Sequence, residues 1–184
     1  MHSKFTESIT SPVTAAELQD WLELPTLESK LSGMLVTATD IAMTYIRQAI
    51  LPTDVQATIT SALDFAHKTQ FDGYPYVKLP WSALRSVASV TLDGVALAND
   101  EYAINTNTVP GRIHFYGAGF VTSIVVVYEA GLAADTSACP EAIKTAIKQI
   151  AAYIYEHRGA CDADEALQNS GAMSSLRRFR AESF

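Results

Sequence analysis

The spacing of apolar residues changes twice along this chain, and this change restricts the folds that it can form. From Leu27 to Ile50 apolar residues recur at steps of three and four, the period of an amphipathic helix. From Val55 to Tyr128 they alternate with polar residues or form short blocks, as in strands. Beyond Pro140 the helical period returns. We therefore expect an α+β fold in which helices flank a small β-sheet module.

Two helices are expected in the N-terminal part. Thr14 and Glu17 have the spacing of a capping box, so the first helix begins there and ends before Pro25. A second helix follows Thr26 and is closed by Pro52; at 1.5 Å per residue it would be roughly 35 Å long. Its apolar stripe consists of Leu27, Leu31, Met34, Leu35, Ile41, Ala42, Tyr45, Ile46 and Ile50.

The middle of the chain predicts short antiparallel strands. Alternation indicates a strand over 55–65, and the unbroken apolar run within 122–128 indicates a central strand covered on both faces. Asp93 and Gly94 suit a type I′ hairpin turn, which needs positive φ at both central residues. Further strands are expected over 76–79, 86–92, 95–97, 102–105 and 112–116. Together they predict a small antiparallel sheet or a partial barrel.

The C-terminal part predicts one helix and then a flexible tail. Pro140 suits the first helical turn, and Ile143, Ile147, Ile150 and Ile154 form an apolar seam at helical spacing. The predicted organisation is thus a single domain over 1–184, with a helical pair (13–51), a β-rich module (54–130), a C-terminal helix that completes a small helical bundle (140–158), and a flexible tail that ends in a contact segment (159–184).

The composition excludes several classes of protein. With 184 residues, 48% of them hydrophobic and a formal net charge of −7, the chain is globular and is no general nucleic-acid binder. No apolar run is long enough to cross a bilayer, and the first eleven residues do not resemble a secretory signal. Cys139 and Cys161 flank the predicted C-terminal helix, so we expect reduced thiols.

No catalytic constellation emerges from the sequence, and we predict no enzyme activity, no cofactor and no metal. The four histidines share no metal-ligand spacing, and Gly159 interrupts the only close pair, His157 and Cys161. The glycine-rich stretch 116–119 lacks the following helix of a phosphate-binding loop. A small hydrolase or metal-dependent enzyme with a dispersed site remains the alternative from another class.

Five blocks, taken in order, carry a family resemblance. They are the helix pair over 14–50; Leu79 and Pro80 with Leu84, Ser86, Val87 and Val90; the turn over 110–113; Val126, Tyr128, Ala130 and Gly131; and the helix from Pro140 to Arg158 with the closing Leu176, Phe179 and Arg180. In this order and spacing they resemble the head–tail connector (adaptor) proteins of tailed bacteriophages and of phage-like gene transfer particles.

The resemblance implies a structural protein of the virion neck, assembled in the host cytoplasm. Twelve copies would form a ring beneath the portal protein, extend the DNA channel, and dock a stopper or tail-completion protein. Packaged DNA would pass through the lumen without specific binding, and no membrane is involved. The alternative within the same class is that the chain is itself the stopper or tail-completion protein.

Two sets of residues are candidates for contacts with partners. An aromatic residue with arginines is typical of interface hot spots. The resemblance implies that the C-terminal segment reaches toward the portal, so we expect a portal contact there: Leu176, Arg177, Arg178, Phe179 and Arg180. A terminal helix that packs on its own domain, or a nucleic-acid tail, would explain the same residues. A second-helix face that is low in charge and two tyrosines that flank the isoleucine seam suggest contacts between subunits, through Thr37, Thr44, Gln48, Tyr153 and Tyr155. A polar surface without a partner is the alternative.

Overall fold

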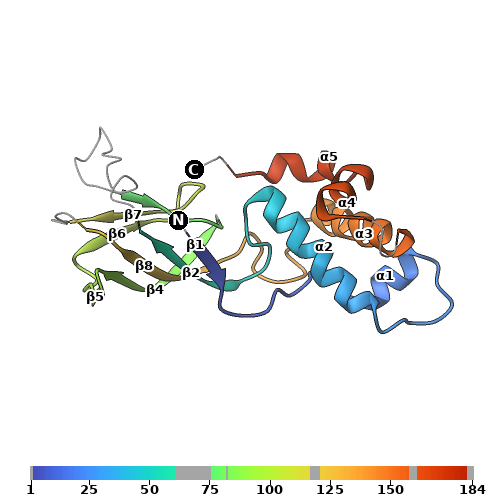
Figure 1. The fold of residues 1–184 in the computed structure, drawn as a ribbon, viewed down its shortest axis with the longest axis horizontal. Coiled ribbons are helices and arrows are strands. Elements are labelled where there is room, and N and C mark those ends of the chain that lie inside the picture. Colours follow the sequence, from blue (N-terminus) through green and yellow to red (C-terminus); the bar gives the residue numbers. More distant parts are fainter. Residues whose placement is uncertain (1, 61–75, 82, 117–120, 158–160, 182–184) are drawn as a thin grey trace. The chain divides into compact units, whose positions relative to one another are not determined.

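The structure, a computed structural model, describes residues 2–60, 76–81, 83–116, 121–157 and 161–181 (Figure 1). The chain forms two compact units, each built from segments that are distant in sequence. The sheet unit comprises Met1–Ser8, Pro52–Gly131 and Ala181–Phe184, and the helical unit comprises Ile9–Leu51 and Leu132–Arg180. The predicted α+β fold with a small antiparallel sheet module is confirmed.

The sheet unit holds two antiparallel sheets in place of the single sheet or partial barrel expected. The larger has the order β1 (His2–Phe5), β2 (Thr53–Ile59), β8 (Ile124–Ala130), β4 (Leu84–Leu92), β5 (Val95–Ala96). The smaller has the order β3 (Tyr76–Lys78), β7 (Arg112–Phe115), β6 (Tyr102–Asn105). Burial alternates along β2, β7 and β8, so each contributes one fully covered face to the core.

Strand β8 is the centre of the larger sheet, as its apolar run predicted. It pairs with β2 on one side and β4 on the other, so that Val126 lies opposite both Ala57 and Val90. Tyr128 is fully buried, and its hydroxyl donates a hydrogen bond to the carbonyl of Pro80. Burial raises the pKa of this hydroxyl, so it stays protonated and remains a donor.

The remaining strand predictions hold within one or two residues, with two exceptions. The turn between β4 and β5 has φ values of 47° at Asp93 and 86° at Gly94, which confirms a turn with two left-handed central residues. Strand β2 ends at Ile59, and residues 61–65 of the predicted strand lie outside the described part of the chain. Strand β1 was missed, because four residues with little apolar content carry no readable alternation.

The helical unit is organised around one helix, α3 (Glu141–Glu156). It contacts α1 (Ala15–Trp21), α2 (Leu31–Ile46), α4 (Ala163–Asn169) and α5 (Ala172–Leu176), and a short 3₁₀ turn, η1 (Arg177–Phe179), follows α5. Ile143, Ile147 and Ile150 of the predicted seam are fully buried. The capping box is also present: the Thr14 hydroxyl accepts from the Glu17 amide, and the Glu17 carboxylate accepts from the Thr14 amide at 2.7 Å.

The second helix is shorter than predicted. It begins at Leu31 and ends at Ile46, since Arg47 takes a left-handed conformation with φ of 58°. Its sixteen residues span about 24 Å. Ala49 and Ile50 are still fully buried, but their carbonyls accept from the amides of Leu132 and Ala133. The apolar spacing therefore continued into a non-helical segment that hydrogen-bonds to a distant part of the chain.

Most of the segment expected to be a flexible tail is instead helical and packed. Asp162 caps α4 through its carboxylate, which accepts from the Glu165 amide at 2.8 Å. Ala166, Ala172 and Leu176 are fully buried, and both α4 and α5 contact α3. The expected tail is therefore corrected for residues 161–181: two helices too short to show a clear period complete the helical bundle.

Candidate functional site

The C-terminal arginine segment is held by the end of α2. The side-chain amide of Gln48 donates to the carbonyl of Phe179, and the guanidinium of Arg180 lies 5.2 Å from the centre of the Tyr45 ring. The guanidinium of Arg178 lies 4.7 Å from the Phe179 ring. These contacts give the segment a fixed backbone with charged groups on its outer side.

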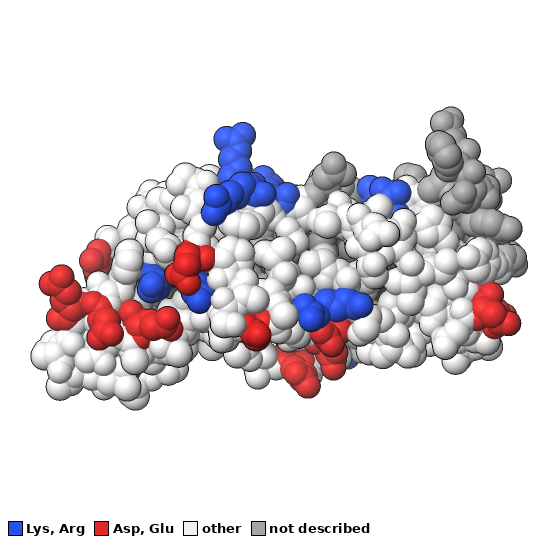
Figure 2. Space-filling model, turned by 180° about the vertical axis from the view of Figure 1, so that it is seen from behind, with Lys and Arg blue, Asp and Glu red and all other residues white. Residues whose placement is uncertain are grey.

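Only part of this segment is exposed. Arg177, Arg178 and Arg180 are exposed and Phe179 is half-buried, whereas Leu176 is fully buried. In the view of Figure 2, a cluster of basic side chains stands at the upper edge of the helical unit, on the left, and acidic side chains gather toward its left end. The sequence-based alternative of a terminal helix packing on its own domain is thus realised for Leu176, and the arginines remain accessible.

The candidate interface residues from the second predicted helix differ in exposure. Thr37 and Thr44 are exposed. Gln48 lies beyond the helix end, is 6% exposed, and uses its amide within the unit. Gln48 and Leu176 therefore do not belong to an accessible surface of the helical unit.

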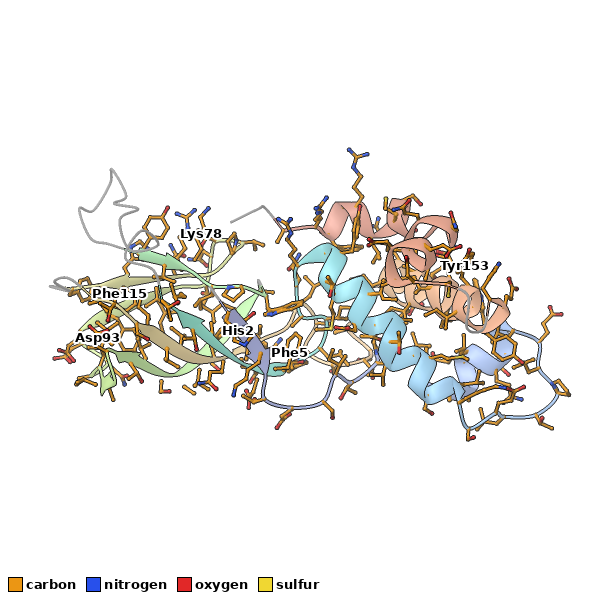
Figure 3. All side chains as sticks on the ribbon, in the orientation of Figure 1. His2, Phe5, Lys78, Asp93, Phe115 and Tyr153 are labelled. Carbon is orange, nitrogen blue, oxygen red and sulfur yellow. The ribbon has the colours of Figure 1, made fainter. Side chains whose placement is uncertain are left out.

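The two candidate tyrosines of α3 are half-buried and have partners within the helical unit. Tyr153, labelled in Figure 3, donates to Glu165 at 3.1 Å, and its ring stacks on His157 with centroids 4.0 Å apart. Tyr155 donates to Glu28 at 2.9 Å. Both side chains thus fasten α3 to other parts of its own unit. A contact with a neighbouring subunit would use their remaining exposed edges.

A groove between α2 and α4 was not predicted. It has a volume of about 450 Å³ and is lined by Asp40, Ile41, Thr44, Tyr45, Arg47, Ala163, Asp164, Leu167 and Arg180. Ile41 and Leu167, 9% and 7% exposed, give it an apolar floor. The sequence offered no signal for it, because its residues come from 40–47, 163–167 and 180, which only the tertiary fold brings together.

The sheet unit carries a cluster that joins its first strand to the Leu79–Pro80 block. The Trp81 indole donates to the Ser3 hydroxyl at 3.1 Å, and the centre of its ring lies 4.6 Å from that of Phe5. Phe5 is labelled in Figure 3. Trp81 has φ of 55°, a left-handed value that a bulky residue rarely adopts. Trp81 is thus an anchor for β1.

The described residues show no group of three histidine, cysteine, aspartate or glutamate side chains arranged to hold a metal ion. Among the helices of the described part, none is long and apolar enough to cross a membrane. Cys139 is buried, and burial raises the pKa of its thiol to about 11, which makes it unreactive at neutral pH.

Comparison with solved structures identifies proteins that share this fold over their whole length. A chain from the neck of an empty gene transfer agent (GTA) particle, computed with C6 symmetry, matches with a TM-score of 0.75 at 19% identity. Chains from the neck of the native particle, computed with C12 symmetry, and from the native virion match with TM-scores of 0.74 and 0.73 at 19% and 20% identity. Each match covers 100% of this chain and 97% of the other.

At this identity the likeness establishes a common fold. No family model matches the sequence, and no curated protein matches it. The fold is thus that of components of phage-like particle necks, and both units are included in it, since the match spans the whole chain.

Proposed function

We propose that this protein is a structural component of the neck of a tailed, phage-like particle, and that it acts as the head–tail adaptor. The observation that carries the proposal is the match over 100% of this chain and 97% of a GTA neck chain. A match of this extent includes both units and their order in the chain. It is therefore a likeness of the whole fold and is not limited to one supersecondary motif. The protein's role is assembly, without catalysis or a cofactor.

The adaptor forms a ring beneath the portal. A closed ring needs heterologous interfaces, in which one patch meets a different patch on the next copy. The necks that contain the similar chains were computed with C6 and C12 symmetry, which supports a ring of twelve copies. A net charge of −7 suits a channel through which packaged DNA slides, because a basic lumen would bind phosphates strongly.

Within this function, the exposed arginines contact the portal protein. Arg177, Arg178 and Arg180 project from a backbone that the Gln48 side chain holds at Phe179, so little backbone conformational entropy is lost on binding. The partner surface is therefore expected to be acidic. The stopper or tail-completion protein binds the opposite side of the ring.

Deleting the gene in the producing strain tests the proposal. We expect DNA-filled capsids without tails, and restoration of tailed particles by the gene in trans. Cryo-electron microscopy of the complemented particles should show the chain in the neck, in contact with the portal. Density one ring further from the capsid would instead identify the stopper or tail-completion protein, and tailed particles without the gene would refute a neck role.

The portal contact is tested by charge reversal rather than by truncation. Removing the residues from Ser174 onward would also remove Leu176, which is fully buried, and would disturb the helical unit. We expect Arg177→Glu with Arg178→Glu to leave the protein folded and to reduce tailed particles. Lys4→Glu with Lys78→Glu, the same charge change in the sheet unit, is the matched control. Equal yields from both variants would exclude the arginines from the portal contact.

A further inference from the structure

The groove between α2 and α4 has the features of a docking site for a side chain. Its volume of about 450 Å³ lies in the range of small-ligand pockets, and its floor is apolar at Ile41 and Leu167. Its charged lining consists of Arg47, Arg180, Asp40 and Asp164, and Asp40 lies about 10 Å before Arg47, the residue at the end of α2. An apolar group with charges beside it therefore fits this groove better than a purely charged one.

The helical unit also presents an exposed apolar surface near α1. Trp21 at the end of α1 is 46% exposed, and Leu27 in the connection to α2 is 58% exposed. Asp20 and Glu23 are exposed beside them, and neither makes an ion pair within the described residues. The ammonium group of Lys148 lies 5.1 Å from the centre of the Trp21 ring. We call Asp20, Trp21, Glu23 and Leu27 the α1 corner.

The groove and the α1 corner lie toward opposite ends of the same helix. Figure 1 shows α1 beside the start of α2, whereas the groove is lined by the second half of α2. Leu31 and Ile41 are separated by about 15 Å along the helix axis. The α1 corner of one chain therefore cannot enter the groove of the same chain, and only a second copy can bring the two together.

We infer that the α1 corner of one copy docks into the α2–α4 groove of the next copy. Leu27 and Trp21 cover the apolar floor, and Asp20 and Glu23 meet Arg47 at the rim. The charges are complementary at one end of the groove, where Asp20 and Glu23 meet Arg47. The acidic Asp40 of the same groove lies about 10 Å from Arg47. Because the two patches differ and lie apart on each copy, the contact is heterologous and repeats from copy to copy.

This inference rests on the proposed neck function, because it names one interface by which the ring closes. It also assigns Thr44 to the contact between copies, since this exposed residue lines the groove.

Disulfide trapping in assembled particles tests the contact. Leu27→Cys with Thr44→Cys, in a Cys161→Ser background that keeps the buried Cys139, should form bonds between copies under mild oxidation. Because the interface is heterologous, a non-reducing gel should show a ladder of dimers, trimers and higher species. Leu27→Cys with Ser174→Cys is the matched control, since Ser174 is exposed but does not line the groove; it should give no ladder.

A charge exchange provides a second, independent measurement. Arg47→Glu should reduce incorporation into particles, and Asp20→Arg with Glu23→Arg should do the same. Combining all three changes should restore incorporation by roughly tenfold relative to either partner alone, as expected if about 1.4 kcal/mol of coupling is recovered. Additive losses in the combined variant would overturn the pairing of these charges.

The outcomes separate this inference from the proposed function. If the chain is in the neck but the Leu27–Thr44 pair gives no ladder, the interface is wrong and the neck role stands. A cross-link to a different protein would also overturn it and would assign the groove to that protein. If the chain is absent from particles, both proposals fail together.

Discussion

The two units of this protein each depend on one central element, and they hold that element in different ways. In the sheet unit β8 is bonded through its backbone to β2 on one side and β4 on the other. In the helical unit α3 satisfies its own backbone hydrogen bonds and meets four other helices through side chains alone. The sheet unit should therefore be sensitive to changes in backbone geometry, and the helical unit to changes in side-chain volume.

The largest expected effect is on the centre of the helical unit. Ile147→Ala should lower the free energy of unfolding by about 2–5 kcal/mol, because it removes a fully buried side chain and leaves a cavity beside α3. Hydrogen exchange should accelerate mainly in α2, α3 and α5. Ile154→Ala, in the half-buried position of the same seam, is the control and should cost less. Equal acceleration in β2 and β8 would mean that the units unfold together.

A smaller effect on stability, of opposite sign in the two units, is expected when one glycine in each unit is replaced by alanine. A Cβ at Gly111 would lie 2.6 Å from the Cβ of Leu84, so Gly111→Ala should destabilise the sheet unit by about 1–3 kcal/mol. Gly33 in α2 has open space at the same position, so Gly33→Ala should stabilise the helical unit by about 0.4–1 kcal/mol. Urea unfolding of both variants checks the pair. Stability changes of the same sign would contradict the contrast.

The same contrast explains what the sequence revealed. Strands such as β8 and β7 were predicted because alternation and apolar runs are local signals that pairing then reinforces. The capping box and the Asp93–Gly94 turn were predicted because their chemistry lies within four residues. These elements would be predicted in any chain with the same local pattern.

The errors fall where distant segments decide the outcome. Arg47 ends α2 because Ala49 and Ile50 hydrogen-bond to residues more than 80 positions away, which apolar spacing does not reveal. Helices α4 and α5 are seven and five residues long, so neither completes two full turns, and α3 stabilises them by packing. The groove depends on the same packing. The arginines of the C-terminal segment are exposed, but the burial of Leu176 among them depends on the tertiary fold.

The smallest expected effect is on the pH dependence of stability, to which one carboxylate in each unit contributes. In the sheet unit the Asp93 carboxylate, labelled in Figure 3, accepts from the Thr122 hydroxyl at 2.7 Å and from the Ser123 amide at 2.8 Å. These bonds, led by the one from the Thr122 side chain, hold the pKa of Asp93 below the ordinary 3.8. In the helical unit the hydrogen bonds from Thr14, first that of its backbone amide, lower the pKa of Glu17 below 4.5.

Both pKa values are lower in the folded state than in the unfolded chain, so each carboxylate stabilises its unit fully above the unfolded value. That contribution is lost as the pH falls through the folded value. Carboxyl chemical shifts measured by NMR during an acid titration should give midpoints below 3.8 for Asp93 and below 4.5 for Glu17. Thr122→Val should raise the midpoint of Asp93 and leave that of Glu17 unchanged. Thr14→Ala should raise the midpoint of Glu17 and leave that of Asp93 unchanged. If either substitution moved both midpoints, the two carboxylates would report on a shared structure, and the two units could not be treated as separately stabilised.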